Sequence, residues 1–367
     1  MLNSLYIKKF RLFKELKIER LRRVNLFVGK NNSGKTCLLE ALHLYAKNAS
    51  PDSLYQLISE RGENWKREGV LDEHCGSIPE MSNPLRYLFY NYQFPEVGKP
   101  GIEMGSLKSI EKSLKLGIGA YHHDGQRLIR IDESQLSNNP LTHVELVIEK
   151  GDEAIPLLRL NGESLFSPPI LNKAKLNVQL ISTKPLNRQT LARLWDNINV
   201  QLSSRKEVFK GLQLIDERIE EVVLVGYLDE PNQVDNIMPV LIYHDSEEKR
   251  LITNLGEGIS RVFYIILALV NARDGFLLID EFENGLHWKV QAKLWEMIFN
   301  LAKKLDVQIF ATTHSQDCVQ SFYAVWETQE NQGSFHRLHN RSGFGTVATP
   351  YRCETLANAL EMDVEMR

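Results

Sequence analysis

The fold of this chain is decided by residues 24–36, which read VNLFVGKNNSGKT. Residues 24–28 form a mostly apolar run typical of a buried strand, and apolar residues recur at helical spacing from about residue 35 to residue 46. Residues 29–36 fit the pattern G-x-x-x-x-G-K-[ST], for which a strand before and a helix after are the expected context. The sequence therefore predicts a phosphate-binding loop within an α/β fold.

This loop carries the chemistry needed to hold a nucleotide. Its glycines let the backbone curl so that successive N–H groups face a phosphate, and the start of the following helix adds partial positive charge. Lys35 can reach the β- and γ-phosphates, and the Thr36 hydroxyl can bind Mg²⁺. We expect every residue of the loop to contact the nucleotide, namely Gly29, Lys30, Asn31, Asn32, Ser33, Gly34, Lys35 and Thr36.

A second apolar run ends in two carboxylates. Residues 276–279, FLLI, predict a central parallel strand, so Asp280 and Glu281 follow at the strand end where ligands bind in open α/β sheets. We expect Asp280 to hold Mg²⁺ and Glu281 to orient and deprotonate the attacking water. His314 follows the next predicted strand, where a neutral imidazole can hydrogen-bond the γ-phosphate or the water. Further hydroxyls in that segment come from Thr312, Thr313 and Ser315.

Two glycines precede a long apolar helix that the pattern predicts at residues 259–272. Gly256 and Gly258 stand at its start, where unpaired backbone N–H groups form a second site for an anion. We call residues 255–261, LGEGISR, the signature segment. The alternative is a plain loop with a helix cap.

In the order of these motifs the chain resembles the ATPase heads of the ABC class. Residues 7–13, IKKFRLF, look like the first strand of the RecF, SMC and OLD-like branch. The signature segment, residues 283–287 (ENGLH) and residues 311–315 (ATTHS) look most like the stand-alone bacterial AAA-type ATPases related to OLD. The resemblance is close over residues 1–48 and about 250–330, and loose between them.

The resemblance implies a dimer in which two ATP molecules lie between the P-loop of one subunit and the signature segment of the other. Transporter signatures read Leu-Ser-Gly-Gly-Gln, whereas Gly256 stands at the serine position here. Backbone N–H groups, Ser260 or Arg261 must then supply the contact with the γ-phosphate. The residues expected to act in trans are Gly256, Glu257, Gly258, Ser260 and Arg261.

Two further site residues are expected on weaker signals. Arg11 is expected to face the nucleotide, and Gln93 is one candidate for the glutamine that links Mg²⁺ to the arm of such a head. The other cations of the first 36 residues fit a rim for DNA or RNA, but a solvated strand face is the commoner use of such residues.

The predicted head is split by a long insertion. Its motifs lie at residues 29–36 and 255–315, so we assign residues 1–50 and 246–367 to the head and residues 51–245 to the insertion. Alternating patterns and turn signals predict a β-rich lobe at about residues 105–183, and helical spacing predicts an arm at about residues 187–215. The fold class is α/β, an ABC-type P-loop head with a mixed sheet, interrupted by a β-rich and helical insertion.

Composition excludes several classes of protein. The 367 residues carry 44 Lys and Arg against 47 Asp and Glu, and 43% are hydrophobic, so neither disorder nor a strongly basic nucleic-acid binder is indicated. The longest uncharged apolar run is nine residues, 262–270, well short of the roughly 20 that span a bilayer. Four cysteines without a C-x-x-C pair indicate no zinc site and suit the cytoplasm.

The sequence thus predicts a cytoplasmic, Mg²⁺-dependent ATPase that forms a dimer or a higher oligomer with ATP. By resemblance alone, it regulates a separate effector protein, a nuclease or toxin, in defence against phage, because residues 330–367 are too few for the Toprim nuclease of OLD proteins. The alternative is a RecF-like repair ATPase that clamps DNA. A transporter subunit is disfavoured by the missing Leu-Ser-Gly-Gly-Gln, and a scaffold without turnover by the pair Asp280 and Glu281.

Overall fold

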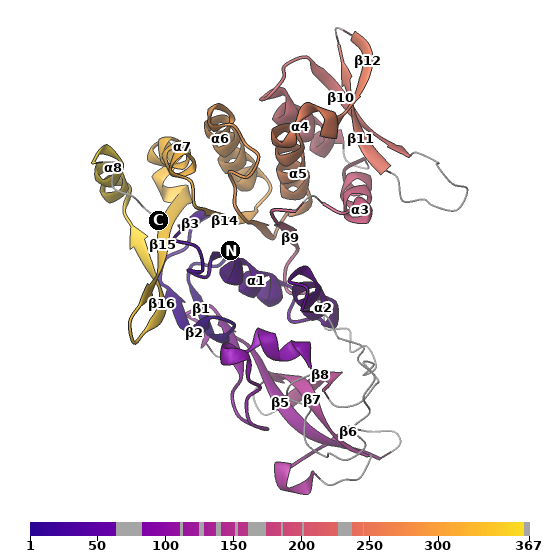
Figure 1. The fold of residues 1–367 in the computed structure, drawn as a ribbon, viewed down its shortest axis with the longest axis vertical. Helices are drawn as coiled ribbons and strands as arrows, with labels where there is room; N and C mark the ends of the chain where they lie inside the picture. Colours follow the sequence, from indigo (N-terminus) through magenta and orange to yellow (C-terminus); the bar gives the residue numbers. More distant parts are fainter. Residues whose placement is uncertain are drawn as a thin grey trace.

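Three β-sheets organise the chain (Figure 1). The computed structural model describes residues 1–63, 83–110, 113–124, 128–136, 141–150, 153–160, 174–184, 186–199, 202–226, 237–244 and 246–362. No helix in these ranges is long and apolar enough to cross a membrane.

The central sheet has six strands in the order β16-β15-β3-β14-β13-β9. Five of them run parallel, and β16 pairs antiparallel with β15. Their bounds are β3 (Val24–Val28), β9 (Val178–Ile181), β13 (Phe276–Ile279), β14 (Gln308–Thr313), β15 (Gly333–Arg341) and β16 (Gly345–Tyr351). Strands from both ends of the chain therefore meet in one sheet, which brings the P-loop beside the Asp280–Glu281 pair.

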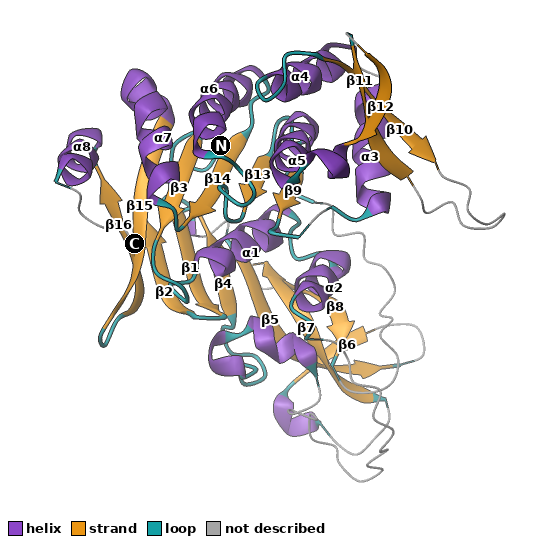
Figure 2. Ribbon diagram, turned by 45° about the horizontal axis from the view of Figure 1, so that its top comes forward, coloured by secondary structure: helices purple, strands orange, loops and turns teal. Residues whose placement is uncertain are grey.

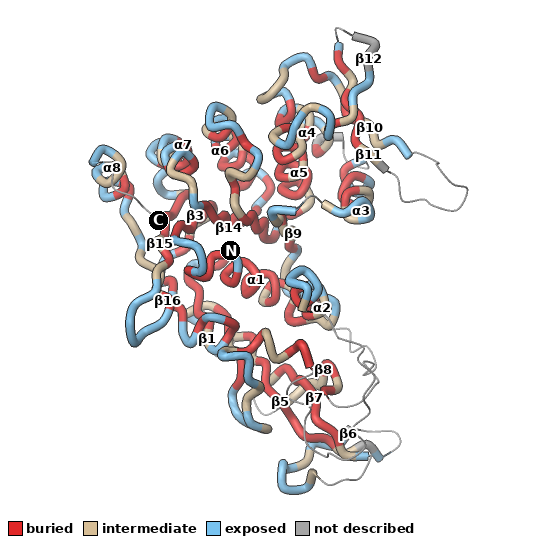
Figure 3. Tube along the Cα trace, viewed as in Figure 1, coloured by how far each residue is buried: buried red, intermediate tan, exposed pale blue. Residues whose placement is uncertain are grey.

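Both faces of the central sheet are buried, in two separate cores (Figure 3). Neighbouring residues of β13 alternate between them, since Leu277 and Ile279 join one core while Phe276 and Leu278 join the other. This alternation is the two-residue period of a strand, and burial on both faces is why the strand reads as a continuous apolar run.

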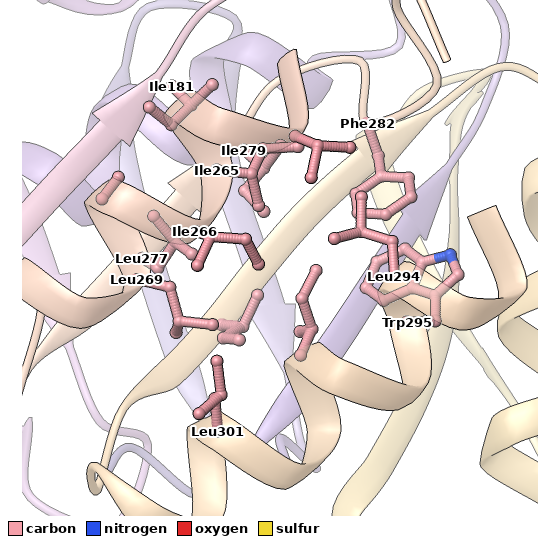
Figure 4. Close-up of a cluster of buried hydrophobic side chains, with 14 of the residues drawn as sticks. Ile181, Ile265, Ile266, Leu269, Leu277, Ile279, Phe282, Leu294, Trp295 and Leu301 are labelled. Carbon is pink, nitrogen blue, oxygen red and sulfur yellow. The ribbon is translucent and has the colours of Figure 1, made fainter. Parts of the chain in front are cut away.

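Helices from the C-terminal half and the arm cover one face of the sheet (Figure 2). They are α3 (Arg188–Asn199), α4 (Leu202–Gln213), α5 (Glu257–Asn271), α6 (Trp288–Lys304) and α7 (Gln316–Trp326), followed along the chain by α8 (Cys353–Glu361). Figure 4 shows the core that they enclose behind the end of β13, where the rings of Phe282 and Trp295 stack with centroids 3.8 Å apart.

The opposite face packs against α1 (Lys35–Ala46), α2 (Pro51–Glu60) and the second sheet. This sheet is antiparallel, with strand order β2-β1-β4-β5-β7-β8 and with β6 paired to β5. Its strands are β1 (Leu5–Phe10), β2 (Phe13–Ile18), β4 (Ile102–Gly105), β5 (Leu114–His123), β6 (Leu128–Ile131), β7 (Thr142–Lys150) and β8 (Glu153–Arg159). The N-terminal hairpin is thus continuous with the β-rich lobe.

The third sheet lies beside α4 and α5 at the far end of the molecule (Figure 1). Its strands are β10 (Ile219–Gly226), β11 (Ile237–Tyr243) and β12 (Ser246–Leu251), all antiparallel. Short 3₁₀ turns complete the described elements: η1 (Pro84–Leu88), η2 (Tyr90–Tyr92), η4 (Glu133–Gln135), η5 (Ile252–Leu255) and η6 (Glu327–Gln332).

The predicted α/β class with a mixed sheet is confirmed. The strand pairing also bears on where the boundary between head and insertion lies. β9 lies within residues 51–245, yet its backbone pairs with β13, and α3 contributes Leu191 and Trp195 to the core shared with α5. β1 and β2, in turn, pair with each other and with β4 of the β-rich lobe. We therefore propose to keep the head-and-insertion division but to place β9, α3 and α4 with the head.

Candidate nucleotide site

The P-loop joins β3 to α1 in backbone conformations that only certain residues adopt readily. Gly34, directly before α1, has φ 96°, and an added Cβ there would lie 2.7 Å from the Phe13 ring. Gly29 and Asn32 also have positive φ, at 155° and 64°. Glycine carries no Cβ penalty in this region, so the two glycines of the motif are required by the turn itself.

The Lys35 ammonium lies inside the loop. Its Nζ donates to the carbonyl oxygens of Gly29 at 2.6 Å and Lys30 at 3.2 Å. Burial lowers the pKa of Lys35, while the charges of Asp280, Glu281 and Glu283 act in the opposite direction. A largely desolvated cation held between carbonyls and nearby carboxylates is well placed to exchange these partners for phosphate oxygens.

Asp280 is the centre of a hydrogen-bonded bridge between two strand ends. Its Oδ2 accepts from Thr36 Oγ1 at 2.9 Å, and its Oδ1 accepts from Thr312 Oγ1 at 2.6 Å. Thr312 Oγ1 also accepts from the backbone N–H of Glu281 at 2.9 Å. The structure thus brings Thr36 and Asp280 together, and it gives Thr312 a positioning role that the sequence had not assigned.

Glu281 turns away from this bridge toward solvent. Its backbone is left-handed, with φ 47°, and its side chain is 39% exposed. A positive φ at a residue other than glycine is uncommon and clusters at functional sites. The turn separates the two carboxylates, so that Asp280 faces Thr36 while Glu281 remains accessible to water.

His314 reaches the P-loop from the end of β14. It lines a hollow of about 220 Å³ together with Gly29, Lys30 and Asn31. Its Nδ1 lies 3.0 Å from Glu283 Oε1, and its backbone N–H donates to the same oxygen at 2.9 Å. The sequence did not identify Glu283 as a site residue, and its only local signal was a third carboxylate within the turn after β13.

The signature segment lines a different hollow, of about 320 Å³. Gly256, Glu257 and Ser260 contribute to it, and Gly256 begins α5 with φ 99°. The two hollows have no lining residue in common. The segment also packs closely on the turn after β13, because an added Cβ on Gly258 would lie 2.8 Å from the Gly285 carbonyl oxygen.

Arg261 also lines the hollow of the signature segment, but its guanidinium has partners within its own chain. It is buried, and it donates to the carbonyl oxygen of Ser182 at 2.5 Å, of Asp280 at 2.6 Å and of Glu281 at 2.9 Å. Burial lowers its pKa to about 10, against the raising effect of the three nearby carboxylates. Its guanidinium therefore ties β9 to β13 within its own chain, and its expected contact with a phosphate in trans stays a prediction.

Arg11 also differs from expectation. It is 3% exposed and forms ion pairs with Glu40 of α1 at 2.8 Å and with Glu63 at 3.1 Å. Glu40 also pairs with Arg61 at 2.6 Å. The guanidinium thus joins the β1–β2 turn to α1 and to the end of α2, which is a structural role and not the predicted contact with nucleotide.

Gln93 is exposed just after η2, and no described hydrogen bond or ion pair joins it to Thr36 or Asp280. The strand beside β13 is β9, and the Asp280 N–H donates to the Ile181 carbonyl oxygen at 2.8 Å. Ser182 follows Ile181 and lies at this edge of the site. Gln93 has no contact with the Thr36–Asp280 pair among the described residues, and its expected link to Mg²⁺ stays a prediction.

Comparison with known families agrees with this geometry. The model of the family described as "AAA ATPase domain" matches residues 1–210, more than half of the chain. The chain belongs to the AAA ATPase domain family. The expected membership in an ABC-class, AAA-type family is thereby confirmed. The expectation that the protein is an ATP-hydrolysing enzyme is confirmed with it. A second model, described as "AAA domain, putative AbiEii toxin, Type IV TA system", matches residues 151–317.

Individual relatives of this AAA ATPase match it either at low sequence identity or over a short stretch of the chain. An "ATP/GTP phosphatase" of Helicobacter pylori is 25% identical over 346 residues, covering 87% of each chain. The replication and repair protein RecF of Lactococcus lactis is 34% identical over 80 residues, which are 21% of this chain and 22% of RecF. Among solved structures, an SMC head bound to the C-terminal winged-helix domain of ScpA shares 12% identity at a TM-score of 0.49, covering 96% of this chain and 98% of the other.

The donors at the AAA ATPase site fit a magnesium ion. The Thr36 hydroxyl and the Asp280 carboxylate are hard oxygen donors already within hydrogen-bond distance of each other. Mg²⁺ prefers a small number of such protein oxygens, with phosphate and water completing an octahedron. No cluster of three or more His, Cys, Asp or Glu with metal-site geometry occurs in the part of the chain that the structure describes.

Proposed function

We propose that this AAA ATPase hydrolyses ATP at a site completed by a second copy of the chain. The observation that carries the proposal is the separation of the two hollows: Gly29, Lys30, Asn31 and His314 line one, and the signature segment lines the other. In this proposal the two hollows are the two halves of a nucleotide site, at different places on one chain. A pair of chains related by a twofold axis would bring each P-loop to the other chain's signature segment.

In this proposal each residue near the P-loop has a defined task. Lys35 and the loop amides hold the β- and γ-phosphates, and Thr36 and Asp280 hold Mg²⁺, which when bound neutralises charge on the transferred phosphoryl group. Glu281 accepts the proton of the attacking water, because its carboxylate is the exposed one. His314, which lines the same hollow as Gly29, Lys30 and Asn31, hydrogen-bonds the γ-phosphate.

We further propose that turnover regulates a separate effector protein, a nuclease or a toxin, in defence against phage. Support comes from the family model over residues 151–317, whose description refers to a type IV toxin–antitoxin system. DNA clamping of the RecF kind is the competing role. Turnover stimulated by DNA and lost steeply with salt would favour clamping, whereas a second protein that alters turnover would favour the effector.

The shared site is tested by mixing two defective variants. Lys35→Ala removes the P-loop cation, and Ser260→Asp places an anion in the hollow of the signature segment. Ser260 is preferred to Gly258 because an added Cβ at Gly258 would press on its own chain. In an equal mixture, half of the dimers pair the two variants and each has one intact site of two, so turnover should recover to about a quarter of the wild-type value.

The matched control is Lys35→Ala mixed with the double variant Lys35→Ala/Ser260→Asp, which contains no intact P-loop and should stay inactive. Phosphate release is the readout. If Ser260→Asp alone hydrolyses ATP at the normal rate, the signature segment is only a helix cap and the site belongs to a single chain.

A further inference from the structure

His314 stands between two carboxylates that hold it unequally. Its Nδ1 lies 3.0 Å from Glu283 Oε1 but 3.9 Å from Glu281 Oε1. Glu283 also accepts the backbone N–H of His314, and its side chain is 11% exposed, against 39% for Glu281. The buried carboxylate therefore fixes both the ring and the main chain of the histidine.

This contact decides which ring nitrogen faces the P-loop. An ionised carboxylate only accepts hydrogen bonds, so His314 Nδ1 must carry the proton that it shares with Glu283. Nε2 lies on the other side of the ring and points away from Glu283. Because the ring lines the hollow with Gly29, Lys30 and Asn31, Nε2 is the nitrogen available to a ligand there.

We infer that Glu283 is a positioning residue, which sets the tautomer of His314 and keeps the imidazole away from Glu281. The inference rests on the proposed function, since Glu281 is its general base. If Nδ1–H moved the remaining distance to Glu281, it would occupy a lone pair needed for the water's proton. Glu283 thus orients His314 and leaves the Glu281 carboxylate free to accept the proton of the water, without contacting the substrate itself.

A second observation indicates that the negative charge of Glu283 is not explained by a contribution to folding stability. Its Oε2 is buried and has no hydrogen-bond partner among the described residues. An unpaired buried oxygen costs free energy, so a neutral glutamine, which keeps an acceptor for the backbone N–H of His314, would serve folding at least as well. The carboxylate is therefore best explained by what it does to His314.

A double-mutant cycle tests this role. Glu283→Ala should reduce kcat by about 10- to 100-fold with KM little changed, the range usual for the partner of a functional histidine. In a His314→Ala background the same substitution should change kcat by no more than about twofold, because its only route of action is gone. Glu283→Gln keeps an acceptor oxygen and should lose less. Asp317→Asn, which removes an exposed carboxylate three residues from His314, is the matched control.

¹⁵N NMR of the imidazole tests the contact without nucleotide. His314 should show a protonated Nδ1 in the wild type and should shift toward the Nε2–H form in Glu283→Ala, while Asp317→Asn leaves it unchanged. An unshifted tautomer, or an equal loss of kcat in both backgrounds, would overturn the inference. If the tautomer shifts but the wild type hydrolyses no ATP, the pairing stands and the proposed function fails.

Discussion

At the scale of single residues, the buried titratable groups divide into those with partners and those without. Asp280 has two hydroxyl donors and Glu40 has two guanidinium groups, so their charges are compensated. His43, on the buried side of α1, has no hydrogen-bond partner for either ring nitrogen among the described residues. Asp280 belongs to the nucleotide site and Glu40 joins α1 to its neighbours, whereas the unpartnered His43 makes the fold sensitive to acid.

We predict that His43→Leu makes stability less dependent on pH. Burial lowers the pKa of His43 from 6.5 to about 4, so between these values the unfolded chain binds a proton that the folded chain does not. Stability contributed by the neutral ring is therefore present above pH 6.5 and falls by up to about 3 kcal/mol as the pH drops to 4. His336, with its pKa also lowered to about 4 by burial, should still contribute its own decline.

Urea unfolding at pH 7, 6, 5 and 4 measures this effect. His43→Leu should lose less free energy of unfolding over the range than the wild type, and should be at least as stable at pH 7. His244→Gln, at an exposed position, is the control. A variant with the wild-type slope would show that His43 is protonated without cost in the folded protein.

At the scale of elements, the sequence predicts those helices and strands whose signal lies within one short stretch of the chain. Strand β13 has the predicted bounds, and β3 with its loop and α1 follow directly from the P-loop pattern. β9 could not be recognised as a head strand, because it has four residues and its partner β13 lies almost 100 residues later. Arg261 is a similar case: a cation at the start of an apolar helix fits a phosphate in trans as well as carbonyl oxygens in cis, and only the tertiary structure decides.

We predict that Arg261→Met destabilises the fold. Three carbonyl oxygens, of Ser182, Asp280 and Glu281, would lose their donor, at a cost of about 3 kcal/mol in the free energy of unfolding. Arg273→Met, at an exposed position after α5, should change it by less than about 0.5 kcal/mol. Chemical denaturation compares the two variants. If Arg261→Met has normal stability and fails only to dimerise with ATP, Arg261 contacts the phosphate of the other chain instead.

At the scale of the whole molecule, the two hollows lie at different places on one chain. If the nucleotide site is shared, two chains must therefore associate and separate in each round of hydrolysis. The P-loop lies at the C-terminal ends of β3, β13 and β14, whereas the signature segment begins α5 beside the third sheet. ATP would then be the link between two chains, and its hydrolysis would release them. Such a cycle couples nucleotide state to the distance between the β-rich lobes of the two copies.

We predict that Glu281→Gln binds ATP, dimerises and stalls. Gln is nearly isosteric but cannot take up the proton of the attacking water, and loss of a general base typically costs roughly 10²–10⁴ in rate, about 3–5 kcal/mol of barrier. Ground-state binding should barely change, because Lys35, Thr36 and Asp280 are intact. The dimer should therefore persist in ATP and Mg²⁺, while wild-type turnover per chain rises with protein concentration.

Size-exclusion chromatography with ATP, run beside a phosphate-release assay, measures both halves of this prediction. Glu296→Gln, an exposed carboxylate on α6, is the matched control and should behave as wild type. Near-normal turnover in Glu281→Gln would remove this residue from the role of base. A slow variant that stays monomeric in ATP would keep Glu281 as the base but exclude the shared site, because the intact P-loop would then bind nucleotide without recruiting a second chain.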